Sequence, residues 1–79
     1  RVTLRLERRL LNAAMDRFGR EAAYLENPDG TVNVTAEVEV SPTFLSWVLC
    51  FGSAASILSP DSAREDLQKL ARDALAQYE

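Results

Sequence analysis

The chain has 79 residues, of which 47% are hydrophobic and 27% are charged, and its formal net charge at pH 7 is −3. This length corresponds to a single domain, residues 1–79, and the hydrophobic content excludes a disordered chain. The absence of histidine removes the commonest general base and metal ligand, the single cysteine excludes an internal disulfide, and the acidic balance disfavours a dedicated nucleic-acid binder.

The first element is a strand followed by a helix. Val2, Leu4 and Leu6 alternate with polar residues, and this period of two predicts a strand with one buried face. Apolar residues then recur at intervals of three and four residues over 10–18, which predicts an amphipathic helix that ends at Gly19.

Two strands joined by a tight turn follow this helix. The segment EAAYLE, residues 21–26, is short and apolar, and NPDG, residues 27–30, has the proline and glycine typical of a turn. Valine and alanine alternate with polar residues over 31–40, so we expect a third strand of about ten residues, antiparallel to the second.

Serine followed by proline occurs at Ser41-Pro42 and again at Ser59-Pro60, and each pair predicts a helix start with the serine as N-cap. The first of these helices ends at Gly52 and is followed by a short strand, AASIL, over residues 54–58. The second carries one apolar stripe, composed of Leu67, Leu70, Ala71, Ala74, Leu75 and Tyr78.

This order of elements predicts an α+β fold. Two right-handed βαβ crossovers that share one sheet give a ferredoxin-like βαββαβ sandwich, with a four-stranded antiparallel sheet and two helices on one face. The last helix is an additional C-terminal element.

The second helix has two apolar sides, whereas a helix on a sheet needs only one. Phe44, Trp47 and Phe51 form the second side. We expect the terminal helix to cover Trp47; a subunit or domain interface and a ligand pocket are the two alternatives. Cys50 lies within the same apolar pattern, so we expect a buried structural thiol.

Residues 1–20 contain six arginines and two carboxylates, a net charge of +4, whereas residues 21–79 carry −7. Arg1 and Arg5 are expected on the open face of the sheet, and Arg8 and Arg9 at the start of the first helix. Two interpretations stay open for these four arginines. They are either a solvated rim or a surface that contacts an anionic ligand or an acidic domain, because guanidinium groups bind phosphate and carboxylate bidentately.

The residues give little support to catalysis. Glu37 and Glu39 share a strand face with polar neighbours, so we expect both to be solvated and to pair with Arg5 across the strands. The open face carries no aromatic ring of the kind that RNA-recognition domains use, and the loop after the first strand has no glycine with which to hold a phosphate as acylphosphatases do. We expect no enzyme, no cofactor and no metal site.

The location of the chain is inferred from the same residues. No apolar run approaches the roughly 20 residues of a membrane span, so no membrane partner is expected, and a lone cysteine suits a reducing cytoplasm. Because the sequence begins with Arg1 rather than methionine, we expect it to be part of a longer protein.

Residues 44–79 resemble the WCX domain, the C-terminal extension of WYL-domain bacterial transcriptional regulators. The hairpin sequence NPDGTVNVTAEVEV fits the same family, and the resemblance covers essentially the whole chain. The residues that match in order are Trp47, Phe51-Gly52, Ile57-Leu58, Pro60, Arg64 and Tyr78.

This resemblance implies a non-catalytic, ligand-sensing or oligomerisation domain of a cytoplasmic regulator that also has a helix-turn-helix and a WYL domain. Its implied partners are that WYL domain, a second subunit in a homodimer, and a nucleotide or nucleic-acid effector of the parent protein. Phe44, Trp47, Phe51 and Tyr78 are the expected packing or interface residues, and Arg1, Arg5, Arg8 and Arg9 the expected anionic contact. The alternative is a stand-alone ferredoxin-fold module that binds a small molecule.

Overall fold

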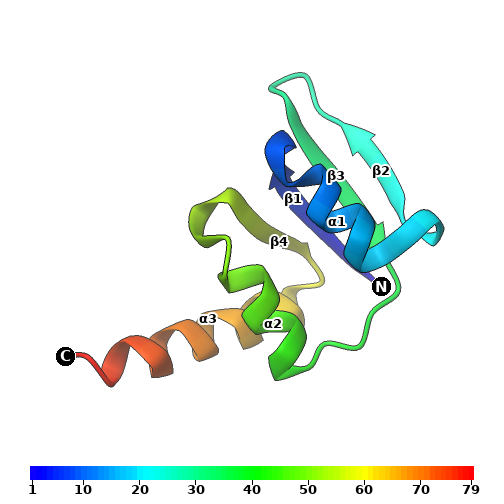
Figure 1. The fold of residues 1–79 in the computed structure, drawn as a ribbon. Coiled ribbons are helices and arrows are strands. Elements are labelled where there is room, and N and C mark those ends of the chain that lie inside the picture. The colour runs from blue at the N-terminus through cyan, green and yellow to red at the C-terminus, as the bar shows by residue number, and fades with distance from the viewer.

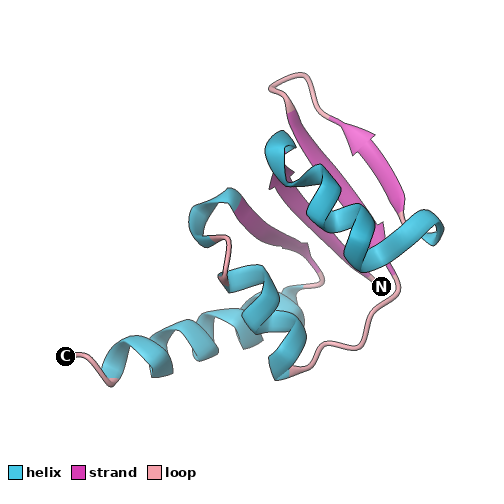
Figure 2. Ribbon diagram, in the orientation of Figure 1, coloured by secondary structure: helices cyan, strands magenta, loops and turns pink.

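The computed structural model describes residues 1–79 and has the predicted α+β architecture (Figures 1 and 2). Four strands form one antiparallel sheet in the order β2-β3-β1-β4, which is the strand order of a ferredoxin-like sandwich. The strands are β1 (Val2–Glu7), β2 (Ala23–Glu26), β3 (Thr31–Ala36) and β4 (Ala55–Ser59), and the helices are α1 (Leu11–Phe18), α2 (Pro42–Leu49) and α3 (Asp61–Ala76). Short 3₁₀ turns occupy residues 8–10, 19–21 and 52–54.

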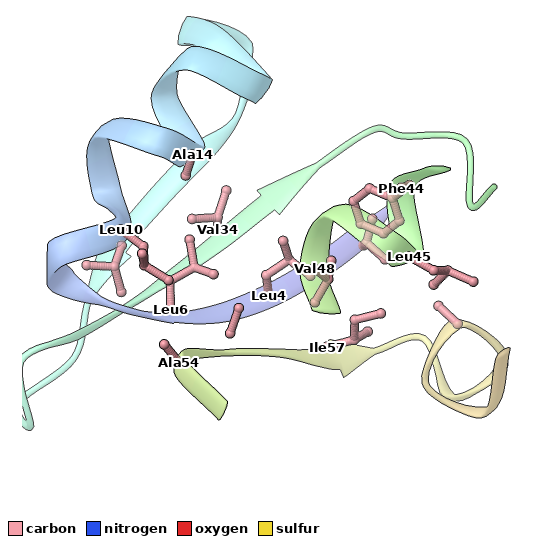
Figure 3. Packing of buried hydrophobic residues seen from close by; sticks show 14 residues of the cluster. Leu4, Leu6, Leu10, Ala14, Val34, Phe44, Leu45, Val48, Ala54 and Ile57 are labelled. Atoms are coloured by element: carbon pink, nitrogen blue, oxygen red, sulfur yellow. The ribbon is translucent and has the colours of Figure 1, made fainter. Parts of the chain in front are cut away.

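Helices α1 and α2 pack on one face of the sheet, as the two crossovers predict (Figure 3). Leu4 and Leu6 of β1 and Val34 of β3 point toward Ala14 of α1 and Val48 of α2. All of the buried residues are hydrophobic, and no buried side chain holds an unsatisfied polar atom. The fold therefore depends on apolar packing between the two helices and the two central strands.

The hairpin between β2 and β3 follows the turn residues. Gly30 has a φ of +87°, a conformation that glycine adopts without strain, and its N–H donates to the Asn27 carbonyl oxygen at 3.0 Å. The register is regular, with Ala23 opposite Thr35 and Glu26 opposite Val32.

Strand β3 is shorter than predicted, because it ends at Ala36 rather than residue 40. Ala36 pairs with Val2, the first residue of β1, and on the other side Ala23 begins β2 opposite Thr35. Residues 37–40 therefore have no strand on either side to pair with, although their sequence still alternates. The predicted pairing of Arg5 with Glu37 or Glu39 is also wrong, since Arg5 lies opposite Asn33.

The two serine-proline pairs behave differently. Ser41 is the N-cap of α2, and its Oγ accepts a hydrogen bond from the Phe44 N–H at 3.2 Å. Ser59 is not a cap: it is the last residue of β4 and pairs with Thr3, so α3 begins only at Asp61. Strand pairing therefore overrides the local helix signal at Ser59. The α-helix before Gly52 is also shorter than predicted and ends at Leu49.

Helix α3 contacts β4 and α2 through its first half and extends away from the sheet, so that the C-terminus lies at one end of the molecule (Figure 1). Ala63 is buried and Leu67 and Leu70 are partly buried, whereas Leu75 is exposed. Tyr78 lies beyond the end of α3 and is 88% exposed. The apolar stripe of α3 is therefore covered only over its first half.

We expect Phe44→Ala to destabilise the domain by about 3–5 kcal/mol, because it removes a buried ring and leaves a cavity. Phe44 is only 1% exposed in the native fold. The control Leu75→Ala should change stability by less than about 0.5 kcal/mol. Urea unfolding followed by circular dichroism measures both, and equal losses at the two sites would contradict this core.

Ser41→Ala should cost about 1 kcal/mol through loss of the α2 cap. Ser59→Ala is the matched control, and we expect it to stay within about 0.5 kcal/mol because its hydroxyl caps no helix. Thermal unfolding of both variants separates the two serines. A larger loss at Ser59 than at Ser41 would show that the helix starts are assigned incorrectly.

Candidate functional site

The face of the sheet opposite α1 and α2 has no helix over it, and we call it the open face. Its residues alternate with the buried ones along each strand: Thr3, Arg5 and Glu7 on β1, Thr31, Asn33 and Thr35 on β3, Ala23 and Leu25 on β2, and Ser56 and, past a register irregularity, Ser59 on β4. The central part of this face is polar and hydroxyl-rich. The Thr3 and Thr35 hydroxyls, for example, lie 3.1 Å apart in a cross-strand hydrogen bond.

Arg5 lies in the middle of the open face and is fixed by the β2–β3 turn. Its Nε donates to the Thr31 hydroxyl oxygen at 3.2 Å, and its guanidinium forms an ion pair with Asp29. Asp29 in turn accepts from the Thr31 hydroxyl at 2.6 Å and from the Thr31 N–H at 3.0 Å. The turn therefore orients the one cation at the centre of this face.

These bonds also change the acidity of Asp29. The side-chain and backbone hydrogen bonds from Thr31 are the main reasons that the pKa of Asp29 lies below its ordinary value of 3.8, and Arg5 adds to the effect. Both side chains of the ion pair are about half exposed, so solvent screens the pair.

The four candidate arginines do not converge on one point. Arg1 pairs with Glu37 at 3.2 Å, at the end of the sheet where β1 begins. Arg8 and Arg9 follow the other end of β1, where Arg8 pairs with Glu26 and Arg9 with Glu7. Each arginine therefore already has a carboxylate partner, and each pair is exposed to solvent.

A shallow hollow lies beside Arg5, at the end of the open face near β4. Its volume is about 270 Å³, and its lining includes Glu7, Ser53 and Ser56. Together with Arg5 and Thr31, these residues place a guanidinium, a carboxylate and three hydroxyls around one space. No group of three or more potential metal-ligating side chains occurs in the chain, and no helix has the length and apolar character needed to cross a membrane.

The aromatic side of α2 faces α1, and not α3 as predicted. The Trp47 ring packs edge-on against Phe18 of α1 with centroids 5.4 Å apart, and against Phe51 at 5.0 Å. The reason lies in the helix geometry: Leu45 and Leu49 project from the other side of α2, which leaves the Trp47 side for α1.

Trp47 also has a cationic neighbour that the sequence analysis missed. The guanidinium carbon of Arg17 lies 5.5 Å from the centre of the tryptophan ring, in a cation–π contact. Arg17 directly precedes Phe18, the residue of α1 that contacts Trp47. The cation–π contact could therefore have been predicted only if α1 had been expected to face this side of α2. Phe44 itself is part of the core, and Phe51 is partly buried.

Cys50 is exposed, which corrects the expectation of a buried thiol. It caps the C-terminal end of α2, two residues past Val48, and therefore points about 200° away from that buried side chain. Its thiol donates a hydrogen bond to the Trp47 carbonyl oxygen, with an S···O distance of 2.9 Å.

The fold and the open face define a ferredoxin-like α+β domain with an uncovered polar sheet and an appended C-terminal helix. The family model of the WCX domain matches residues 1–75. The chain therefore belongs to the WCX domain family, as the resemblance in the sequence indicated. No curated protein and no solved structure matches the chain.

We predict that Asp29→Asn lowers the melting temperature at pH 7 and that the difference disappears at low pH. Because the pKa of Asp29 is lowered in the folded state, its carboxylate stabilises the fold above the ordinary value of 3.8, and this contribution is lost as the pH falls through the lower folded pKa. Thermal unfolding from pH 7 to pH 2 tests this. Asp16→Asn is the control at an exposed carboxylate outside any ion pair, and a pH-independent effect of Asp29→Asn would contradict the prediction.

Proposed function

We propose that this domain is the C-terminal regulatory domain of a WYL-type helix-turn-helix transcriptional regulator, and that it acts without catalysis. The observation that carries the proposal is the match of the WCX family model to residues 1–75. The domain docks on the WYL domain of the same chain or on a second subunit, and it helps to transmit effector binding to the DNA-binding helices.

The open face supports this role. It is a broad polar surface with no covering element of its own, and Arg1 and Arg5 lie on it. Arg8 and Arg9 lie past the end of β1, and Arg8 lines a hollow with Leu11 and Tyr24 on the helix-covered side of the sheet. In the proposed regulator these four arginines contact the anionic groups of a nucleotide or nucleic-acid effector, or an acidic surface of the WYL domain.

The ion pairs define how that contact would form. An anion that binds Arg5 competes with Asp29 for the guanidinium, and one that binds Arg8 competes with Glu26. Because these pairs are exposed, each contributes about 0–1 kcal/mol, so exchanging one carboxylate for another anion costs little. The arginines are held in place without being buried.

The hollows favour a docking role over a stand-alone small-molecule sensor. The five main hollows on the surface of the domain have volumes of about 140 to about 270 Å³. Pockets that enclose a drug-sized ligand hold about 300–1,000 Å³. A small molecule in any of them would stay largely in contact with solvent unless a second domain covered it.

We expect the double variant Arg5→Glu and Arg8→Glu, made in the full-length regulator, to need a higher effector concentration for a half-maximal response. The increase should be at least about 10-fold, because the loss of one charge-assisted hydrogen bond weakens binding by about 1.5–3 kcal/mol. The control is Arg64→Glu together with Arg72→Glu, two exposed arginines of α3 outside any ion pair. Circular dichroism checks that both variants fold.

An unchanged response of the Arg5 and Arg8 variant would refute the assignment of these arginines. A full-length regulator that responds normally after deletion of the whole domain would refute the regulatory function itself.

A further inference from the structure

A second hollow lies on the helix-covered side of the sheet, away from the open face. It forms where the end of α1 and the 3₁₀ turn after it meet the end of β3 (Figure 1). Its volume is about 230 Å³. None of the contacts proposed above for the arginines at positions 5, 8 and 9 uses this hollow.

One side of this hollow is apolar. Phe18, Ala22 and Val38 line it; all three are partly buried and pack against the hydrophobic core. Ala36, the last residue of β3, lies beside them. An aliphatic or aromatic side chain that enters the hollow therefore leaves water and contacts carbon atoms of the protein.

The other side of the hollow has two opposite charges that lack ion-pair partners, Arg17 and Glu21. Arg1, by contrast, is paired with Glu37, the third charged residue of the hollow, at 3.2 Å. Arg17 and Glu21 are four residues apart, the spacing of an ion pair on a helix. They do not pair because α1 ends at Phe18, so Glu21 does not lie one helical turn beyond Arg17.

The aromatic residues of α1 and α2 hold Arg17 in place. Its guanidinium carbon lies 5.5 Å from the centre of the Trp47 ring, and that ring packs edge-on against Phe18 and Phe51. No side-chain hydrogen bond or ion pair within the chain uses the N–H donors of Arg17. The guanidinium is therefore oriented by the ring, and its donors remain available for a bidentate contact with a carboxylate.

We propose that this hollow binds a free apolar α-amino acid such as leucine. Arg17 donates to the α-carboxylate, Glu21 accepts from the α-ammonium group, and the apolar side chain lies against Phe18, Ala22 and Val38. This site goes beyond the proposed effector contact and does not rest on it.

The combination of groups in the hollow selects this class of ligand. An α-amino acid carries an anion, a cation and one apolar side chain on a single carbon atom, which matches a free cation, a free anion and an apolar surface around one space. A nucleotide has no cation to offer Glu21, and its phosphate would also face Glu37. An apolar carboxylic acid without an amine would leave Glu21 unpaired beside a second negative charge.

The size of the hollow fits a ligand of this kind. Its volume of about 230 Å³ is below the range of about 300–1,000 Å³ for pockets that enclose a drug-sized ligand, and an amino acid is smaller than such a ligand. Because the hollow is open to solvent, we expect weak binding in the isolated domain, with a dissociation constant of about 1 mM.

An NMR titration of the 79-residue domain with L-leucine at pH 7 tests the proposal. We expect saturable shifts of the Ala22 and Val38 amide signals. Three analogues each remove one contact: 4-methylpentanoate lacks the ammonium group, leucinamide lacks the carboxylate, and glycine lacks the apolar side chain. Each analogue should bind at least about 10-fold more weakly than leucine.

Two variants assign the charged contacts. Arg17→Gln should remove most of the preference for leucine over leucinamide, and Glu21→Gln most of the preference for leucine over 4-methylpentanoate. The matched controls are Arg20→Gln and Glu39→Gln, at two exposed residues that do not line the hollow, and both should bind leucine like the native domain. A substitution that only disturbs the fold would weaken all ligands alike and would leave these preferences unchanged.

Equal binding of leucine and its three analogues would overturn the proposal. So would the absence of a saturable shift at a leucine concentration about 10-fold above the expected dissociation constant. The analogue series uses the native domain and therefore stays decisive when a substitution unfolds the chain. None of these outcomes bears on the effector response of the full-length regulator, which the Arg5 and Arg8 variant tests separately.

Discussion

Antiparallel pairing of β1 with a strand on each side is the constraint on which the rest of the structure depends. Strand β1 pairs with β3 on one side and with β4 on the other, although residues 8–30 separate the end of β1 from the start of β3. Val2, Leu4 and Leu6 project from β1 into the core and are almost completely buried. Helices α1 and α2 pack against these three side chains.

The same pairing determines what the open face presents. Because strand side chains alternate, the register that buries Leu4 and Leu6 necessarily places Thr3 and Arg5 on the opposite face, and a slip of one residue would exchange the two sets. The polar face, the orientation of Arg5 by the turn and the exposure of Leu25 at the β2 edge all follow from one register. Core packing and the candidate functional surfaces are therefore coupled through the backbone of the sheet.

The sequence was sufficient to predict the architecture, because the features that define it are periodic and local. Alternation along β1 and β3, the NPDG turn and the cap at Ser41 each have a mechanism that acts within a few residues. What could not be predicted was where the pairing stops. The alternation of residues 37–40 is as regular as that of residues 31–36, but no strand lies beside them.

The side-chain environments were harder to predict than the elements. The side of α2 that faces α1 depends on how both helices rotate on the sheet, and nothing local to Trp47 encodes that rotation. Cys50 was misplaced because the apolar pattern around it does not show that it lies about 200° around the helix from the buried Val48. The four arginines are close together in the sequence, but in the structure each has a separate carboxylate partner, and those partners depend on the turn and on the strand ends, which only the tertiary structure brings together.

Native-state hydrogen exchange of the backbone amides tests the central role of β1 most directly. If the paired central strand is the last part of the fold to open, the amides of Leu4 and Leu6 will exchange only through global unfolding. The amides of residues 72–79, which lie in the exposed last part of α3 and beyond its end, will exchange much faster. Rapid exchange at Leu4 and Leu6, at rates close to those of the C-terminal residues, would contradict this account of the fold.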